Sequence, residues 1–283
     1  EQHVSDPQKS GVIHYYDTHP INEDEILSRL KAQGIALETL TEDALKDFDQ
    51  DHYGGIDVVD VLAERAGIRA EHHVLDVCSG MGGPARWLAH RIGCRVTGLD
   101  FTLSRVEAAR RLTTLVKLDD KVDFVHGDAT AMPFAAASFD ILISQEAWLH
   151  IPTKPALIAE CARVVKPGGI IAFTDTVILE PLSAEDEARV ARGMHAPALP
   201  PVERYFELLR ANNCQLEQHD DLSAQWRDTL VQRLAMYRSL RELTVAKFGL
   251  AHFEDWDHIY SHYVGLFVAG KLGGARIVAR RLP

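Results

Sequence analysis

The 283-residue sequence has no apolar run close to the roughly 20 residues that a helix needs to span a bilayer. It also has no basic surplus, because 30 Lys and Arg stand against 41 Asp and Glu, a formal net charge of −11. Neutralised phosphates supply most of the affinity for nucleic acid, and anionic lipid surfaces attract basic segments in the same way. We therefore expect neither a nucleic acid nor a membrane as a partner.

Cysteines are few, and none of them forms a CxxC pair. The four lie far apart in the chain, at Cys78, Cys94, Cys161 and Cys214. This spacing gives no disulfide framework and no zinc motif, and reduced thiols are typical of the cytosol. Residues 1–10 also lack the basic and apolar blocks of a signal peptide. We expect a cytoplasmic protein.

From residue 71 onward, short apolar runs alternate with helical patterns and Gly-rich or Pro-rich turns. The predicted strands are His73–Cys78, Arg95–Leu99, Val122–His126, Phe139–Ser144, Ile170–Thr176, Gln215–His219 and Ala275–Arg280. Continuous apolar strands that alternate with helices predict an α/β fold with a parallel sheet covered on both faces.

Helical patterns of a different kind flank this core. Residues 1–70 are predicted to form an N-terminal helical lid, and residues 71–283 the main domain. Within that domain, residues 178–212 and 221–272 are predicted to form helical cap insertions. The expected organisation is one α/β domain with a lid and a substrate cap.

The first predicted strand is followed by the turn CSGMGGPAR, which contains Gly80, Gly82 and Gly83. Glycine has no Cβ, so such a turn bends sharply and lets a ligand approach the backbone. Open α/β sheets bind ligands at this edge, outside the carboxyl ends of their strands. The turn therefore marks a candidate binding site.

Acidic residues end the next two predicted strands, at Asp100 and Asp128. A carboxylate in the first position can accept hydrogen bonds from ribose hydroxyls, and one in the second from an adenine amino group. Either residue alone is more often a helix cap. Together with the Gly-rich turn, and in this order, they favour a nucleoside site.

Five segments in succession carry a family resemblance: LDVCSGMGG, GLD, HGDATAMPF, SFDILISQEAWLHI and ARVVKPGGIIAFTD. They resemble the successive motifs of class I S-adenosylmethionine-dependent methyltransferases. The resemblance implies a Rossmann-like seven-stranded sheet with an antiparallel last strand. Cys78 stands where the family usually has glycine, and we expect its φ angle to be negative.

The resemblance also implies roles for individual residues. The predicted contacts with S-adenosylmethionine are Asp76, Ser79, Gly80, Gly82, Asp100, Phe101, Asp128, Ala129, Gln145 and Tyr16. Gln145 and His150 would be the catalytic residues. His150 is the candidate general base because histidine titrates near neutrality. Tyr15, Trp148 and His150 would contact the acceptor.

The segment DQDHYGG before the core is similar to one in small-molecule methyltransferases, including the sarcosine and dimethylglycine N-methyltransferases. That similarity favours N-methylation of a small amine, with O- or C-methylation of an aromatic or isoprenoid metabolite as the alternative. A nicotinamide-dependent oxidoreductase and a silent cofactor-binding scaffold are more remote. His258 and His262 have metal-ligand spacing but no HExxH glutamate, so no metal is expected. A homodimer is possible on the sequence alone.

Overall fold

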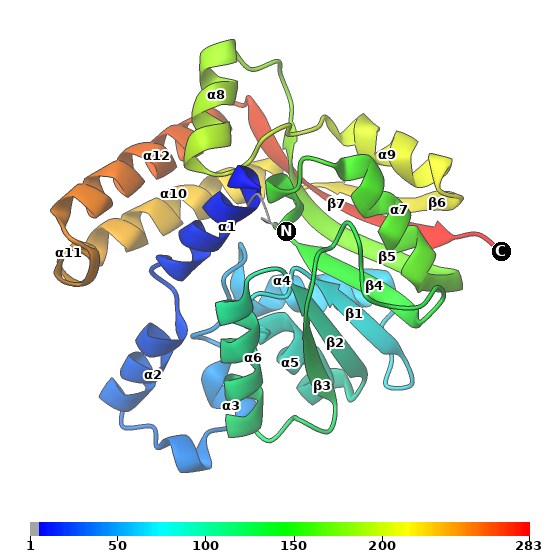
Figure 1. Cartoon of the computed structure of the whole chain (residues 1–283), viewed down its shortest axis with the longest axis horizontal. Coiled ribbons are helices and arrows are strands. Elements are labelled where there is room, and N and C mark those ends of the chain that lie inside the picture. The colour runs from blue at the N-terminus through cyan, green and yellow to red at the C-terminus, as the bar shows by residue number, and fades with distance from the viewer. Residues whose placement is uncertain (1–5) are drawn as a thin grey trace, which may run out of the picture.

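The computed structural model describes residues 6–283, so the first five residues of the predicted 1–70 segment lie outside it. One seven-stranded sheet has the order β3-β2-β1-β4-β5-β7-β6 (Figure 1). Its strands are β1 (His73–Val77), β2 (Arg95–Asp100), β3 (Val122–His126), β4 (Phe139–Gln145), β5 (Val165–Ile178), β6 (Cys214–Asp221) and β7 (Leu272–Arg281). The pairs among β1 to β5 are parallel, whereas β7 runs antiparallel to β5 and β6. The predicted seven-stranded sheet is confirmed.

Helices follow most strands, as the alternating pattern predicts. They are α1 (Pro7–Asp17), α2 (Glu23–Ala32), η1 (Leu37–Thr39), α3 (Glu42–Leu45), α4 (Gly55–Ala66), α5 (Gly83–Ile92), α6 (Leu103–Leu115), η2 (Trp148–His150), α7 (Lys154–Val164), α8 (Ala184–Gly193), α9 (Val202–Ala211), α10 (Ser223–Ser239), α11 (Arg241–Phe248) and α12 (Leu250–Val268). Among residues 6–283, no helix combines the length and the apolar character needed to cross a bilayer.

The two faces of the sheet bury alternate residues of each strand. On β1, Val74 belongs to a core with α4 and α5, whereas Leu75 and Val77 belong to a core with α7 and α9. This is the period of two that side chains on a strand obey. Because both faces are covered there, the central strands β1 and β4 are largely apolar, whereas β6 at the edge of the sheet is mostly polar and exposed.

The N-terminal segment does not form one uniform lid. Helices α2 and α3 pack on α6 through a separate apolar cluster that includes Ile26, Leu30 and Leu112. Helix α1 contributes no buried residue and crosses the carboxyl edge of the sheet (Figure 1). Within the 1–70 segment, α1, His19 and residues 49–53 line the cavity described below, whereas α2 lies away from it.

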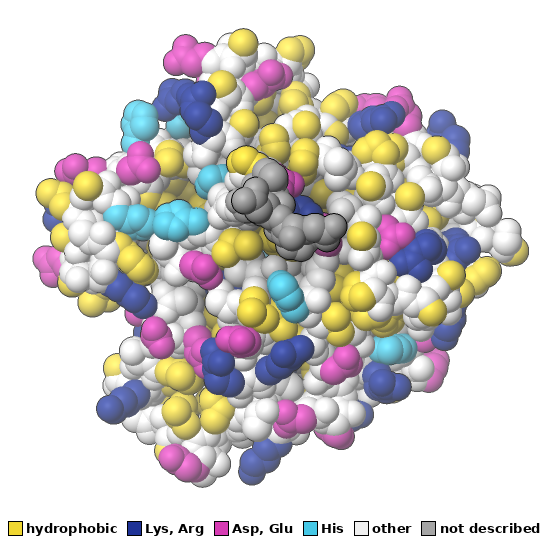
Figure 2. All heavy atoms as spheres, viewed as in Figure 1, with side chains coloured by type: hydrophobic (Ala, Val, Ile, Leu, Met, Phe, Trp, Pro, Cys, Tyr) yellow, Lys and Arg dark blue, Asp and Glu magenta, His cyan; other side chains and the backbone are white. Residues whose placement is uncertain are grey.

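The cap is built from α8, α10, α11 and α12; α8, α10 and α12 meet in a further apolar cluster, whereas α11 buries no residue. The helical pattern over 224–248 is divided at Leu240 into α10 and α11. The strand predicted over Ile170–Thr176 is longer, because β5 begins at Val165 and continues through the Pro-Gly-Gly segment with a register shift. On the face shown in Figure 2, acidic and basic side chains are interspersed and neither sign gathers into a patch.

Candidate active site

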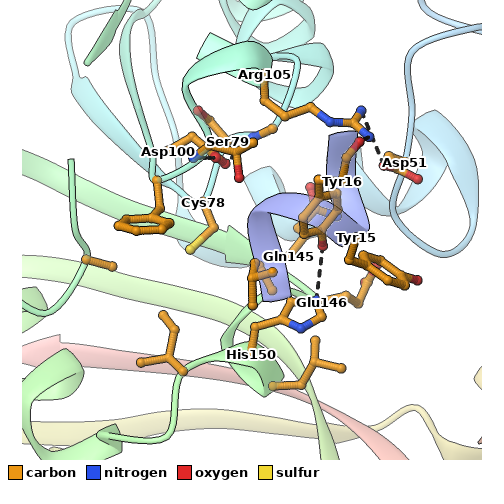
Figure 3. A pocket seen from close by; sticks show the side chains of 18 of the residues that line it. Tyr15, Tyr16, Asp51, Cys78, Ser79, Asp100, Arg105, Gln145, Glu146 and His150 are labelled. Atoms are coloured by element: carbon orange, nitrogen blue, oxygen red, sulfur yellow. Dashed lines mark hydrogen bonds and ion pairs between the residues drawn. The ribbon is translucent and has the colours of Figure 1, made fainter. Parts of the chain in front are cut away.

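A cavity of about 420 Å³ lies at the carboxyl ends of β1, β2 and β4, beneath α1 (Figure 3). Its floor comes from the Gly-rich turn and from the residues that follow each strand. Its walls come from α1, from the segment 49–53 and from α10 and α12 of the cap. Side chains from distant parts of the sequence therefore meet in one enclosed space.

The Gly-rich turn has left-handed backbone at three positions: Cys78 at φ 62°, Gly80 at φ 53° and Gly82 at φ 79°. The expectation of a negative φ at Cys78 is wrong, because a cysteine here occupies a conformation that side chains other than glycine rarely adopt. A Cβ at Gly80 would meet nothing within 4 Å, so this backbone is open to a ligand. A Cβ at Gly82 would come within 2.3 Å of the Phe124 ring, and Gly82 is not among the residues that line the cavity. Gly82 permits close packing against Phe124, whereas Gly80, Met81 and Gly83 line the cavity.

Asp100 ends β2 at the cavity and is tied to the turn. Its carboxylate accepts hydrogen bonds from the Gly80 and Thr102 amides, each at 2.8 Å. Burial raises the pKa of Asp100, while these two bonds oppose the shift. Phe101 lines the cavity beside it, with the Lys9 ammonium 5.3 Å from its ring centre.

Asp128 follows β3 and lies under α1. One carboxylate oxygen accepts from the Thr130 amide at 2.8 Å, and the other pairs with the Lys9 ammonium at 2.6 Å. The bonds to Lys9 and Thr130 hold the pKa of Asp128 below its usual value, although partial burial opposes them. Ala129 is buried and lines the same wall.

Beside the carboxyl ends of β1 and β4, three buried polar atoms of cavity residues lack a hydrogen-bond partner among residues 6–283: Asp76 Oδ2, Ser79 Oγ and Gln145 Oε1. Buried polar groups are normally paired, so such a cluster beside a cavity fits a polar ligand. Burial, reinforced by the nearby Asp100, raises the pKa of Asp76 to about 8. The donor and acceptor groups of S-adenosylmethionine suit these atoms and the open backbone at Gly80.

His150 lies in η2, just after β4, and faces the cavity beneath α1 (Figure 3). Its Nδ1 lies 3.1 Å from the carbonyl oxygen of His195, and its Nε2 lies 3.1 Å from the hydroxyl of Tyr16. A carbonyl can only accept, so we assign the proton to Nδ1, which leaves a lone pair on Nε2. Burial lowers the pKa of His150 to about 4. The imidazole is therefore neutral at neutral pH.

The two other predicted acceptor contacts differ in their placement. The Tyr15 ring lines the cavity, 6.0 Å from the His150 ring and 5.7 Å from that of His19. Trp148 is fully buried in the core, 4.1 Å from the Phe173 ring, and is absent from the cavity lining. The prediction for Trp148 is therefore wrong in this structure, because the tight helix η2 turns positions 148 and 150 to different sides.

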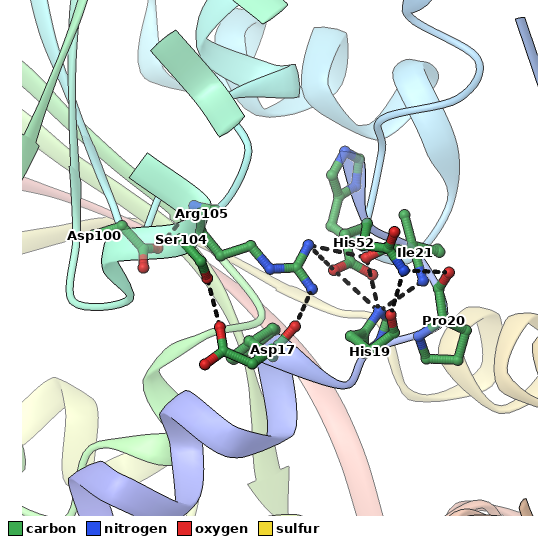
Figure 4. A network of polar contacts seen from close by, with 12 residues as sticks. Asp17, His19, Pro20, Ile21, His52, Asp100, Ser104 and Arg105 are labelled. Carbon is green, nitrogen blue, oxygen red and sulfur yellow. Dashed lines mark hydrogen bonds and ion pairs between the residues drawn. The ribbon is translucent and has the colours of Figure 1, made fainter. Parts of the chain in front are cut away.

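Several cavity residues are ones that the sequence analysis did not single out. Arg105 donates to the backbone carbonyls of Ile21 and Tyr16, at 3.0 Å and 2.9 Å (Figure 4). Glu146 has a left-handed backbone at φ 49° and accepts from the Tyr53 amide at 2.5 Å. Burial raises the pKa of Glu146 to about 7. Glu146 lies in the motif SFDILISQEAWLHI, whereas Arg105 lies five residues after the segment GLD, and only the fold shows that both line the cavity.

The candidate metal pair does not gather a ligand set. The Nε2 of His258 lies 3.2 Å from the Arg189 guanidinium, and that of His262 lies 3.4 Å from the Asp186 carboxylate. Across the part of the chain that the structure describes, no group of three or more suitable side chains comes together.

Comparison with known proteins decides the family. Residues 75–173 match a family described as a methyltransferase domain. The chain is 30% identical over 200 residues to 27-O-demethylrifamycin SV methyltransferase of Amycolatopsis mediterranei, which covers 70% of this chain and 74% of that protein. The chain belongs to the class I S-adenosylmethionine-dependent methyltransferases. The cofactor of this methyltransferase is S-adenosylmethionine, as its motifs predict.

Two further similarities bear on this methyltransferase. It is 35% identical over 172 residues to methyltransferase GfsG of Streptomyces halstedii, covering 59% of this chain and 62% of that protein. The alignment thus spans less than two thirds of that relative. Its fold matches a putative sarcosine dimethylglycine methyltransferase from Galdieria sulphuraria with a TM-score of 0.76, at 18% identity, over 92% of this chain and 98% of that one. At that identity the likeness shows the shared fold alone.

Proposed function

We propose that this methyltransferase transfers a methyl group to a hydroxyl oxygen of a small molecule, with His150 as the general base. The observation that carries the proposal is the neutral His150 imidazole, whose Nε2 lone pair faces the cavity through the Tyr16 hydroxyl. The cofactor supplies an already activated methyl group on a sulfonium sulfur. The chain has to bind, align and deprotonate the acceptor.

The cofactor would lie along the wall from the Gly-rich turn to Asp128. The unpartnered Asp76, Ser79 and Gln145 would hold its methionine part, Asp100 its ribose, and Phe101, Asp128 and Ala129 its adenine. Tyr16 stands between Arg105 and His150, with its ring centre 5.2 Å from the guanidinium. It would separate the cofactor from the acceptor half of the cavity.

The proton of the acceptor hydroxyl would pass to Nε2 of His150 as the methyl–oxygen bond forms and the methyl–sulfur bond breaks. Either the acceptor hydroxyl displaces the Tyr16 hydroxyl from Nε2 of His150, or the Tyr16 hydroxyl relays the proton from the acceptor to Nε2. Because His195 accepts from Nδ1, the ring keeps one orientation during the transfer. Helix α1, held by Lys9 and Tyr16, would act as the lid that excludes water.

The charges in the proposed acceptor half of the cavity favour a hydroxyl acceptor over the amine that the sequence resemblance favours. Two guanidinium groups, of Arg105 and Arg233, lie within 4 Å of the one Asp51 carboxylate there. A protonated amine would meet a net positive charge in this region. The name of one relative, 27-O-demethylrifamycin SV methyltransferase, also indicates an oxygen acceptor for that protein.

The test is the identity of the methylated atom. The protein is incubated with S-adenosylmethionine and 3-hydroxybenzyl alcohol, and separately with 3-hydroxybenzylamine, and products are located by mass spectrometry and NMR. We expect an O-methyl product from both. Transfer to the nitrogen of the second compound, with no O-methyl product from either, would contradict the proposal.

A further inference from the structure

At the end of the cavity away from Cys78 and Asp100, the Asp51 carboxylate has no direct hydrogen bond to any residue of 6–283 (Figure 3). Its nearest nitrogens are those of Arg233 at 3.6 Å, His19 at 3.7 Å and Arg105 at 3.9 Å. The side chain is 27% exposed, and it lines the cavity. Its lone pairs are therefore open to a ligand that donates a hydrogen bond.

Two donors with unused capacity lie beside Asp51, on the cap helices α10 and α12. Arg233 donates to the carbonyl of His52 at 3.2 Å and to the Tyr237 hydroxyl at 2.6 Å, but its Nε is buried without a partner. The hydroxyl of Tyr260, a side chain only 4% exposed, lies close to the Arg233 guanidinium but forms no hydrogen bond of good geometry with it or with any other residue of 6–283. Leaving a buried donor unpaired costs about 1–3 kcal/mol, so a bound acceptor atom here would be favourable.

The charges select a neutral group. Burial lowers the pKa of His19 to about 4, so at neutral pH the ring of cations around Asp51 consists of the two guanidinium groups. The sum of two positive charges and one negative charge disfavours a cationic ligand, and a carboxylate would lie against Asp51 itself. A hydroxyl both donates and accepts, and it carries no charge.

We infer that Asp51, Arg233 and Tyr260 form a specificity subsite that binds a second hydroxyl group of the acceptor. The hydroxyl donates to Asp51 and accepts from Arg233 or Tyr260. The Tyr15 ring spans the gap, since it lies 6.0 Å from His150 and 5.7 Å from His19, so the body of the acceptor would lie along it. The inference rests on the proposed function only in placing the acceptor in this cavity.

The experiment measures binding of three matched compounds to the S-adenosylhomocysteine complex, by titration calorimetry and saturation-transfer NMR. 3-Hydroxybenzyl alcohol can donate and accept at its second group, 3-hydroxybenzaldehyde can only accept, and 3-methylphenol can do neither. The variants are Asp51→Asn and Tyr260→Phe. The matched control is Tyr263→Phe, on the same helix, whose hydroxyl bonds Thr176 at 2.8 Å and whose side chain is not in the cavity lining.

We expect Asp51→Asn to weaken the alcohol about tenfold and to leave the other two compounds within twofold, as loss of one charge-assisted bond would do. Tyr260→Phe should weaken the alcohol and the aldehyde but not 3-methylphenol. The control should change none of them. Equal losses for all three compounds, or no binding of the alcohol to the wild-type complex, would overturn the subsite.

Because no methyl group moves in this experiment, its outcome is separate from that of the proposed function. The expected binding pattern together with N-methylation in the product assay would retain the subsite and remove His150-assisted transfer to oxygen. O-methylation together with equal binding losses would do the reverse.

Discussion

Burial acts in opposite directions on the pKa values of His150 and Glu146, two ionisable residues that follow β4. It lowers that of the imidazole to about 4 and raises that of the carboxyl group to about 7. In both cases burial favours the uncharged form. At pH 7 the His150 imidazole is therefore neutral and the Glu146 carboxyl group is about half protonated, and His150 keeps its lone pair well into the acidic range.

Replacing His150 tests its role as a base. His150→Ala should lower kcat for a hydroxyl acceptor by about 10²–10⁴-fold, since that is the usual contribution of a general base. His150→Gln should restore little, because an amide cannot titrate near neutrality. The affinity for S-adenosylhomocysteine should stay within a few-fold in both variants.

The pH profile sharpens this test. For the wild type, the acidic limb of kcat should fall near pH 4, where Nε2 becomes protonated. A variant that retained both the wild-type rate and this limb would leave His150 as a packing residue. If the acceptor is instead a neutral amine, His150→Ala should lower kcat by less than about tenfold, because alignment of the acceptor alone is then sufficient.

Glu146 gives a prediction on stability. Its folded pKa of about 7 exceeds its ordinary value of 4.5, so between these values the folded protein binds more protons than the unfolded chain. The stability contributed by this group is therefore present at low pH and falls as pH rises to about 7. Relative to Glu146→Gln, the wild type should lose up to about 3 kcal/mol over this range. Urea unfolding at several pH values measures it, and a constant difference between the two proteins would contradict it.

Sequence reasoning brought together the cavity residues at the strand ends but missed most of those on the cap side, for a physical reason. Asp76, Gly80, Asp100 and Asp128 follow from strand ends, because parallel strands bring their carboxyl ends to one edge. Arg233 meets the segment 51–53 through contacts between residues about 180 positions apart, such as its bond to the His52 carbonyl 181 positions away, and no local pattern reveals these.

Among the elements, η2 shows how buried charge can hold a catalytic residue in place. The Lys154 ammonium donates to the carbonyls of Trp148 and Ile151, at 2.7 Å and 2.5 Å, and the Asp175 carboxylate accepts from the Leu149 amide at 3.0 Å. Both charged side chains are at most 4% exposed. Their bonds to the backbone fix the turn that carries His150.

Lys154→Met should therefore act through His150. A misplacement of about 1 Å can cost on the order of 10²-fold, so we expect kcat to fall ten- to hundredfold while KM changes little. In the His150→Ala background the same substitution should cost almost nothing further. Independent, multiplying losses in the double variant would show that Lys154 serves the fold alone.

Helix α1 is predicted to be separable from the fold, in contrast to the helices that follow it. Removing residues 1–17 should leave the unfolding temperature nearly unchanged, because α1 buries no side chain, and should abolish turnover by removing Tyr15 and Tyr16. Removing residues 1–50 should destabilise the protein strongly, because Asp49 bonds the buried Arg86 at 2.6 Å. Thermal unfolding of both truncated proteins tests the contrast, and equal stability would contradict it.

Over the whole molecule, the strands of the sheet were predictable, whereas the cap was predictable as helical but not in how its helices are divided. Apolar strands such as β1 and β4 alternate with helices whatever covers their ends, so the core followed from local pattern. The break between α10 and α11 at Leu240 has neither proline nor glycine to announce it. The resemblance to known motifs added the antiparallel β7, which periodicity alone does not orient.

One helix touches both halves of the cavity, and this has a kinetic consequence. Through Lys9, α1 is bonded to Asp128 on the side where we propose that adenine binds, and through Tyr16 it is bonded to His150 on the proposed acceptor side. A single displacement of α1 breaks both contacts at once. Spent cofactor and methylated product should then be released during the same opening, so that product release shows no obligatory order and a single rate of opening sets the ceiling on turnover.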